Sequence, residues 1–390
     1  MFTILRTRRK ALTQAALVAA AIALAACEPL PSSRGVAIDP GAPVPVALIL
    51  PGGSGNSGDD VLARNLKQAA DLAIADLDGV RIDLRVYNAG SDAGTAAAIA
   101  RQAVDEGAKI ILGPVFAESA NAAGVAVAGD GVNVLSFSNN TDIAGGNVFV
   151  LGPTFQNTAN RLVSFAARSG KGQIMIVHDQ TAAGELGRRA IANAAQRSGA
   201  SIAGTATYEF SQQGVINAAP AIASQVRGSG ANAVFFTADS AGALPLLAQL
   251  LPEAGVSSQN VQFIGLTRWD IPSATLSMPG VQGGWFALPD PGLTGQFQSR
   301  FMAAYGESPH PIAGLAYDGI AAIGALVKRG GGGALSAAAL TQGSGFAGVN
   351  GVFRLLSDGT NERGLAVAQI QNAQVVVIDP APRSFGGAGF

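Results

Sequence analysis

The sequence has few of the residues that build metal centres and covalent catalytic sites. Its 390 residues include one Cys and two His. One thiol cannot form an intramolecular disulfide or a cysteine-based zinc site, and two histidines are too few for a histidine-rich metal site. A catalytic triad would have to use His178 or His310. We therefore expect no metal and no bound cofactor.

Charge is also scarce, and neither sign dominates. Charged residues make up 13% of the chain, with 25 Lys and Arg against 26 Asp and Glu, for a net charge of -1. Because binding to a phosphate backbone depends on an excess of basic residues, nucleic acid is excluded as an expected partner. The chain is instead rich in hydrophobic residues (48%) and glycine (51 residues). Its composition is that of a large globular protein, and its length favours two domains.

The first 26 residues predict a secretory signal peptide. Four basic residues within positions 6–10 precede the apolar stretch 11–23, which is too short to span a bilayer as a mature helix. The stretch is followed by Leu24-Ala25-Ala26-Cys27, which resembles the lipobox of bacterial lipoproteins. The resemblance implies cleavage before Cys27 and a lipid on this residue that anchors the protein in the membrane. It also implies that Glu28 favours the outer membrane of a Gram-negative envelope, with the protein facing the periplasm. Residues 27–43 contain several prolines and predict an extended tether.

From residue 44 onward, short apolar strands alternate with helices. The continuous apolar run 44–50 predicts a buried strand, and similar units recur about ten times. This pattern predicts an α/β protein with parallel sheets that helices cover on both faces. Because the strands are too many for one sheet, we expect two lobes, with crossovers near 152–154 and 289–291. Near the C-terminus, the turn at 357–359 predicts a hairpin.

No motif in the sequence predicts an enzyme. Residues 53–58 fit the dinucleotide pattern G-x-G-x-x-G, but Asp59 and Asp60 follow at the start of a helix and would repel a pyrophosphate from the same amides. We interpret this segment as a glycine-rich turn. Nucleophile-elbow, zincin and Walker motifs do not occur. His178 follows a strand, but the sequence offers no nucleophile beside it.

Seven segments resemble, in order and spacing, the leucine-binding type (type 1) of periplasmic binding proteins. They are IILGPV (110–115), NVLSFS (133–138), VFVLGPT (148–154), QIMIVHD (173–179), ANAVFF (231–236), VQGGW (281–285) and LAYD (315–318). The resemblance implies two Rossmann-like lobes, joined by three crossing segments, that close on a ligand by a hinge motion. The expected domains are the signal peptide 1–26, the tether 27–43, lobe I at 44–153 plus 289–345, lobe II at 154–288 plus 346–378, and a C-terminal tail at 379–390.

The resemblance also implies a ligand cleft at the carboxyl ends of the parallel strands, but the family's contact residues are replaced there. Ala117 stands where amino-acid receptors have Ser, and Ala183 and Asp239 stand where they have aromatic residues. Thr267 stands in place of the carboxylate that pairs with the ligand's amino group. A buried ammonium without a counter-charge costs on the order of several kcal/mol, so we do not expect a free amino acid bound in the usual manner.

Two neighbouring residues of the expected cleft have side chains suited to an anionic ligand. Arg268 would attract an anionic group and Trp269 would supply a stacking face. The alternative is that Arg268 pairs with Asp239 or Asp270 and holds no ligand. The candidate cleft residues are Ser54, Ala117, Ser119, Ser138, Asn139, Asn140, His178, Asp179, Asp239, Thr267, Arg268 and Trp269.

Three functional hypotheses follow, and the weakest of them is an enzyme, because it requires His178 to act without a partner that the sequence names. The loop 135–142 and the lipoprotein start resemble the subgroup described as penicillin-binding protein activators, outer-membrane lipoproteins that stimulate a peptidoglycan synthase. The first hypothesis is therefore a lipid-anchored regulator of peptidoglycan synthesis, with a penicillin-binding protein as its partner. The alternative is a solute-binding receptor of an ABC importer for amino acids or another small polar or anionic ligand.

Overall fold

The computed structural model describes residues 36–39 and 41–386. The expected signal peptide, Cys27 and Glu28 lie outside these residues, so lipidation stays a prediction. Ile38, near the end of the expected tether, is buried in a hydrophobic core, and its N–H donates to the carbonyl oxygen of Gly332 at 3.0 Å. In the described part of the chain, no helix has the length and hydropathy needed to cross a membrane.

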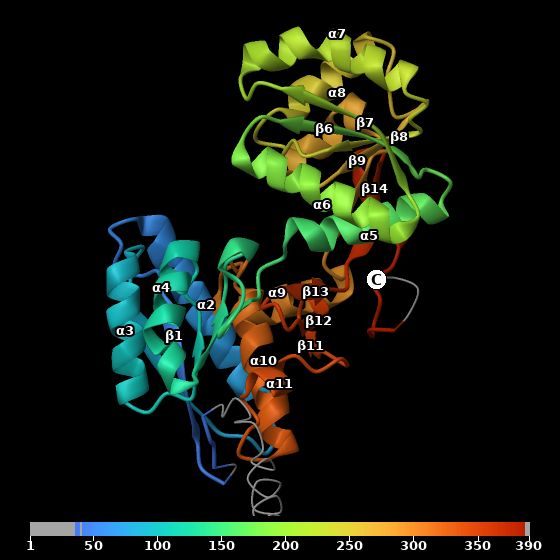
Figure 1. Cartoon of the computed structure of the whole chain (residues 1–390). Coiled ribbons are helices and arrows are strands. Elements are labelled where there is room, and N and C mark those ends of the chain that lie inside the picture. Colours follow the sequence, from blue (N-terminus) through green and yellow to red (C-terminus); the bar gives the residue numbers. More distant parts are fainter. Residues whose placement is uncertain (1–35, 40, 387–390) are drawn as a thin grey trace, which may run out of the picture. The chain divides into compact units, whose positions relative to one another are not determined.

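The first lobe contains a parallel sheet with helices on both faces (Figure 1). Its strands are β1 (Val44–Leu50), β2 (Ile82–Asn88), β3 (Ile110–Leu112), β4 (Asn133–Ser136) and β5 (Val148–Val150). Its helices are α2 (Ser57–Ala75), α3 (Ala93–Asp105), α4 (Ala117–Val127), α9 (Pro291–Tyr305), α10 (Gly314–Arg329) and α11 (Ala337–Leu340). The strand order is β2-β1-β3-β4-β5, with every pair parallel.

The second lobe contains a larger sheet. Its strands are β6 (Gln173–Asp179), β7 (Ser201–Tyr208), β8 (Ala233–Phe236), β9 (Gln262–Gly265), β10 (Trp285–Leu288), β14 (Ala366–Gln371) and β15 (Gln374–Asp379). Its helices are α5 (Phe155–Arg168), α6 (Ala182–Ser198), α7 (Gln212–Gly228) and α8 (Leu244–Glu253). The order is β15-β14-β10-β9-β8-β6-β7, parallel from β10 to β7 and antiparallel at β14 and β15. The two mainly parallel sheets confirm the predicted α/β class.

Each face of the second sheet has its own hydrophobic core. Successive residues of β6 point to opposite faces: Met175 and Val177 pack with α7 and α8, and Ile174 and Ile176 pack with α5 and α6. Burying such a side chain contributes about 1.5–3 kcal/mol. A strand buried on both faces must be apolar at every position, which is why these strands stand out in the sequence.

A third, antiparallel sheet requires a correction to the expected domains. It consists of β11 (Phe346–Gly348), β12 (Gly351–Leu355) and β13 (Asn361–Arg363), and its β12–β13 pair is joined by the hairpin turn predicted at 357–359. Phe346, Phe353 and Leu355 are buried in the same core as β1 and α10. The assignment of 346–378 to lobe II is therefore wrong for residues 346–363. Only β14 and β15 join the second sheet.

Candidate functional site

The chain passes between the two lobes after β5, after β10 and after β13. Two of these connections are fastened by buried side chains of β13. Asn361 Nδ2 donates to the carbonyl oxygens of Val150 (2.7 Å) and Gly152 (2.9 Å), and Arg363 Nε donates to that of Leu151 (3.1 Å). Arg363 Nη1 also lies 3.2 Å from Asp318 Oδ2 on α10. We call Asp318, Asn361 and Arg363 the hinge clasp.

The carboxylate of Asp318 is fully buried within the hinge clasp. Burial raises the pKa of Asp318 above its usual value, and the Arg363 charge and the Val349 N–H, which donates to Oδ1 at 2.8 Å, act in the opposite direction. The burial effect is the larger of the two. Asp318 therefore depends on these partners to carry its charge inside the protein.

The donor groups of the glycine-rich loop after β1 form hydrogen bonds with the carboxylates of Asp59 and Asp60. Gly53 N–H donates to Asp60 Oδ1 at 2.9 Å, and Ser54 Oγ donates to Asp59 Oδ2 at 2.7 Å. Gly53 and Gly55 have φ angles of 79° and 82°, which favour glycine. The carboxylates occupy the donors that a pyrophosphate would need, in agreement with the interpretation of this segment as a turn.

The other candidate residues of the first lobe lie at the ends of β3 and β4. Ser119 is fully buried and its Oγ donates to the carbonyl oxygen of Ser91 at 3.2 Å. Ser138 is also buried, and its Oγ accepts from Asn140 N–H at 3.1 Å. Ala117 is half-buried and begins α4. The two serine hydroxyls therefore support the loops, and Asn139 is the exposed one among these candidate residues.

A hollow of about 600 Å³ brings Asn139 and Asn140 together with residues of α5 and α6. Ala183 lines it together with Arg189. The full lining is Asn139, Asn140, Thr141, Asp142, Thr154, Phe155, Gln156, Ala183, Leu186, Arg189, Ala190 and Asn193. Most of these side chains are polar, which suits a polar solute.

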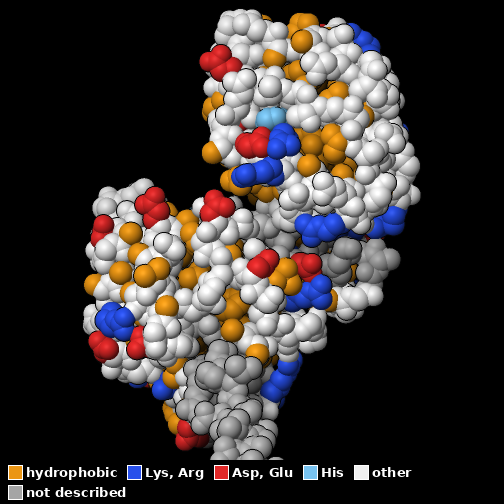
Figure 2. All heavy atoms as spheres, viewed as in Figure 1, with side chains coloured by type: hydrophobic (Ala, Val, Ile, Leu, Met, Phe, Trp, Pro, Cys, Tyr) orange, Lys and Arg blue, Asp and Glu red, His pale blue; other side chains and the backbone are white. Residues whose placement is uncertain are grey.

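The candidate residues of the second lobe lie where β6, β8 and β9 end. Asp179 and His178 are 7% and 8% exposed, and His178 Nδ1 lies 2.8 Å from the Asp179 carbonyl oxygen. Asp179 Oδ1 accepts from the N–H of Thr181 at 2.9 Å and from its hydroxyl, just before α6 begins. Asp239 is exposed in the loop after β8. On the face drawn in Figure 2, basic and acidic side chains gather beside a histidine on this lobe.

Arg268 and Trp269 do not form the anion site that the sequence predicts, because Arg268 is paired with a carboxylate and Trp269 is buried. Arg268 Nε donates to Asp270 Oδ1 at 2.9 Å, and Nη2 donates to Oδ2 of the same carboxylate. This ion pair is the alternative that the sequence analysis leaves open. Trp269 is 0% exposed and packs against Phe236, with ring centroids 6.2 Å apart. The prediction of a stacking face at Trp269 is wrong, because the apolar ring is buried in the core under α8. Thr267 Oγ1 donates to the carbonyl oxygen of Ala238 at 3.4 Å.

Sequence reasoning missed two aromatic residues at the end of β7. Tyr208 is 1% exposed, and its hydroxyl has no hydrogen-bond partner among the described residues. Burial, followed by the charges of Asp179 and Asp239, raises the pKa of Tyr208. Phe210 is 60% exposed. The signal available in the sequence was an aromatic pair around Glu209 directly after a strand.

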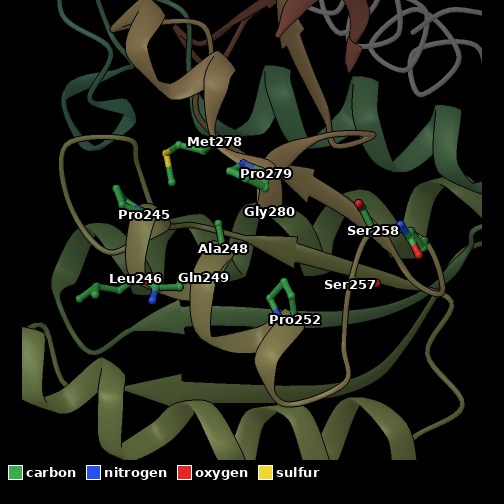
Figure 3. A pocket seen from close by; sticks show the side chains of 11 residues that line it. Pro245, Leu246, Ala248, Gln249, Pro252, Ser257, Ser258, Met278, Pro279 and Gly280 are labelled. Atoms are coloured by element: carbon green, nitrogen blue, oxygen red, sulfur yellow. The ribbon is translucent and has the colours of Figure 1, made fainter. Parts of the chain in front are cut away.

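A separate hollow of about 570 Å³ lies alongside α8 and contains none of the candidate residues. Figure 3 shows Leu246, Pro252 and Met278 among its side chains. The described residues contain no group of three His, Cys, Asp or Glu side chains placed to hold a metal ion.

The geometry defines a two-lobed α/β binding protein, with loops of both sheets presented at the carboxyl ends of their parallel strands. The family model described as "Periplasmic binding protein" matches residues 43–374. The chain therefore belongs to the periplasmic binding protein family, whose members bind and transport solutes and are not enzymes. Membership indicates a periplasmic location. No curated protein matches the chain by sequence at a significant level.

Solved structures of the same fold are similar over most of the chain. A putative branched-chain amino acid ABC transporter protein from Rhodospirillum rubrum is 18% identical, with a TM-score of 0.74, covering 86% of this chain and 100% of that one. A substrate-binding protein from Desulfitobacterium hafniense in complex with Leu is 17% identical, with a TM-score of 0.64 and coverage of 86% and 100%. A solute-binding protein from R. palustris in complex with benzoate is 18% identical, with a TM-score of 0.56 and coverage of 90% and 99%.

Proposed function

We propose that this protein is the solute-binding receptor of an ABC importer. The observation that carries the proposal is the family match, which extends over both lobes and all three connections between them. The solved relatives named above are described as ABC transporter or solute-binding proteins, and two of them hold a small molecule. The polar hollow around Asn139 and the loops at the strand ends give this chain a place for a solute.

The two solutes seen in those relatives, leucine and benzoate, both carry a carboxylate. In this chain Arg268 already has a carboxylate partner, Asp270, and the family's contact positions hold Ala117, Ala183 and Thr267. These differences support a solute of another chemical class, or another mode of binding.

The alternative first suggested by the sequence is activation of a penicillin-binding protein by an outer-membrane lipoprotein. Its support is the lipobox-like segment before Cys27 and the loop 135–142. The comparisons favour the receptor, because the solved relatives named above include no activator. The lipid anchor is compatible with both functions, because it fixes the protein to a membrane without setting what the lobes bind.

A binding screen on the purified full chain tests the proposal. Amino acids, aromatic acids and organic amines are added singly, and thermal midpoint and calorimetric affinity are recorded. We expect one solute class to bind and to raise the midpoint, because a ligand that binds only the folded state stabilises it. If no class binds but the protein stimulates glycan polymerisation by a bifunctional penicillin-binding protein, the receptor function is rejected in favour of the activator.

A further inference from the structure

The carboxyl edge of the second sheet carries an excess of acidic side chains. The ends of β6, β7, β8 and β9 and the loops that follow them contain four acids and one base. The base, Arg268, pairs with Asp270, and within the described residues no Lys or Arg forms an ion pair with the other three, which are Asp179, Glu209 and Asp239. The first-lobe loops at 51–56, 89–92, 113–116 and 137–147 contain no Lys or Arg. A cation would therefore meet uncompensated negative charge at the second-lobe edge, and the first-lobe loops contain no base that would oppose it.

The basic residues nearest in sequence to this edge are on α6, which packs against the opposite face of the sheet. Arg188 pairs with Glu185, and Arg189 lines the hollow around Asn139. This part of α6 packs in the core that contains Ala190, whereas Tyr208 packs in the core on the other face. Neither arginine therefore neutralises the acids on the Tyr208 face.

Tyr208 lies beside Asp179, and the negative charges of Asp179 and Asp239 both act on its hydroxyl. It is the register partner of Asp179 in the parallel pair of β6 and β7, so the two side chains leave the sheet on the same face. The charges of Asp179 and Asp239 both act on the Tyr208 hydroxyl, which is buried and has no partner among the described residues. Native proteins seldom leave a buried hydroxyl unpaired, and such a group at a strand end points to a missing partner.

An exposed aromatic ring borders the same place. Phe210 lines a hollow of about 330 Å³ with Val215, Gly242 and Ala243, and Val215 and Ala243 belong to the core that contains Tyr208. A Cβ placed on Gly242 would lie 2.9 Å from Asp239 Oδ1 and 3.5 Å from Phe210 Cε2. The carboxylate and the ring are therefore neighbours across this glycine.

We propose that Asp179, Tyr208, Phe210 and Asp239, together called the ammonium site, bind the positively charged group of a small organic amine or quaternary ammonium ion. The carboxylates supply the opposite charge, the ring face of Phe210 attracts the cation, and the Tyr208 hydroxyl gains a hydrogen-bond partner. The inference rests on the proposed function, because the cation is the transported solute.

Calorimetry on the full chain tests the ammonium site with choline, ethanolamine and putrescine. The matched probe is the uncharged carbon isostere of choline, in which a tert-butyl group replaces the trimethylammonium group. We expect at least one of the three cations to bind. For choline, we expect the uncharged isostere to bind at least about tenfold more weakly. If the isostere binds as well as choline, charge is not what the site recognises and the inference is overturned.

Variants separate the site from a general effect of charge. Asp239→Asn removes one negative charge at the site, and we expect it to weaken cation binding about tenfold or more. Asp78→Asn removes one negative charge from an exposed pair with Lys328 on the first lobe, and we expect no change in affinity. Equal effects of the two substitutions would overturn the inference.

Tyr208→Phe removes only the unpaired hydroxyl. We expect it to leave the thermal midpoint of the free protein unchanged or higher, and to weaken cation binding. If leucine or benzoate binds, the cations do not, and Asp239→Asn leaves that affinity unchanged, the ammonium site is rejected and the receptor function stands. If none of the three cations binds, the ammonium site is rejected, and the wider solute screen decides the receptor function separately.

Discussion

Replacing Arg363 by methionine tests whether the hinge clasp holds the connections between the lobes. Methionine keeps an unbranched apolar side chain but has no guanidinium group. The side chains of Arg363 and Asp318 are 4% and 0% exposed, so the substitution leaves a buried carboxylate without its cation. The carbonyl oxygen of Leu151 also loses both guanidinium donors. Removing one partner of a buried pair costs about 3–5 kcal/mol, and we expect the free energy of unfolding to fall by about this amount.

Arg354→Met is the matched control, because it lies in the same hairpin and also stacks on a phenylalanine. Arg354 pairs with Glu362, with side chains 29% and 26% exposed, and lies over the Phe385 ring, whereas Arg363 lies over Phe353. A pair so much more open to solvent contributes about 0–1 kcal/mol. Urea unfolding followed by circular dichroism compares the variants. The reasoning is refuted if Arg363→Met costs less than about 1 kcal/mol, or if Asp318→Asn in the same chain does not restore part of the loss.

Two further predictions concern pH and packing. Burial lowers the pKa of His310 below 6.5, and its Nδ1 accepts from Ile312 N–H at 3.4 Å, so the fold favours the neutral ring. Stability is therefore lost as pH falls from about 6.5 through the lower folded-state pKa, and His310→Gln flattens this dependence; an NMR titration of His310 with a midpoint at or above 6.5 contradicts it. A Cβ at Gly280 would lie 1.7 Å from the Ala248 carbonyl oxygen, so Gly280→Ala is expected to cost about 1–3 kcal/mol in urea unfolding. Gly295, inside α9, has no such neighbour within 4 Å, and Gly295→Ala is expected to stabilise by about 0.5–1 kcal/mol; equal effects of the two contradict the packing argument.

The strands were predictable because most of them are buried on both faces. The run predicted as 44–50 is β1 with the same bounds. The hairpin at 357–359 was predictable from its turn residues, but the lobe against which the hairpin packs was not predictable. Alternating apolar residues such as Phe353 and Leu355 show that one face of a hairpin is buried, and they do not show which core it covers.

The candidate site was predictable at the level of loops and not of side chains. The carboxyl ends of parallel strands meet at one edge, which places Asp179, Asp239 and Arg268 on the second-lobe edge from strand order alone. The direction of each side chain depends on packing. Trp269 turns inward where Gly265 leaves room for its ring, since a Cβ there would lie 2.2 Å from Nε1. Tyr208 was missed because it is the last residue of β7, where a tyrosine is equally typical of the hydrophobic core.

The pairing of charges distinguishes the hinge from the cleft edge. At the hinge, Arg363 has Asp318 as its partner, and Arg161 on α5 has Asp379 at 2.9 Å. At the second-lobe edge, Asp179 and Asp239 have no such partner within the described residues, and the first-lobe loops bring no base toward them. Asp179 is already buried, whereas Asp239 is exposed, so closing the lobes without a cation would move the Asp239 carboxylate out of water uncompensated, which opposes closure. A cationic solute reverses this balance, because its charge interacts more strongly with the carboxylates when water is excluded. Binding is coupled to closure only when the ligand interacts more favourably with the closed state than with the open state. At the ammonium site, a positively charged ligand provides this difference in interaction energy and an uncharged ligand does not.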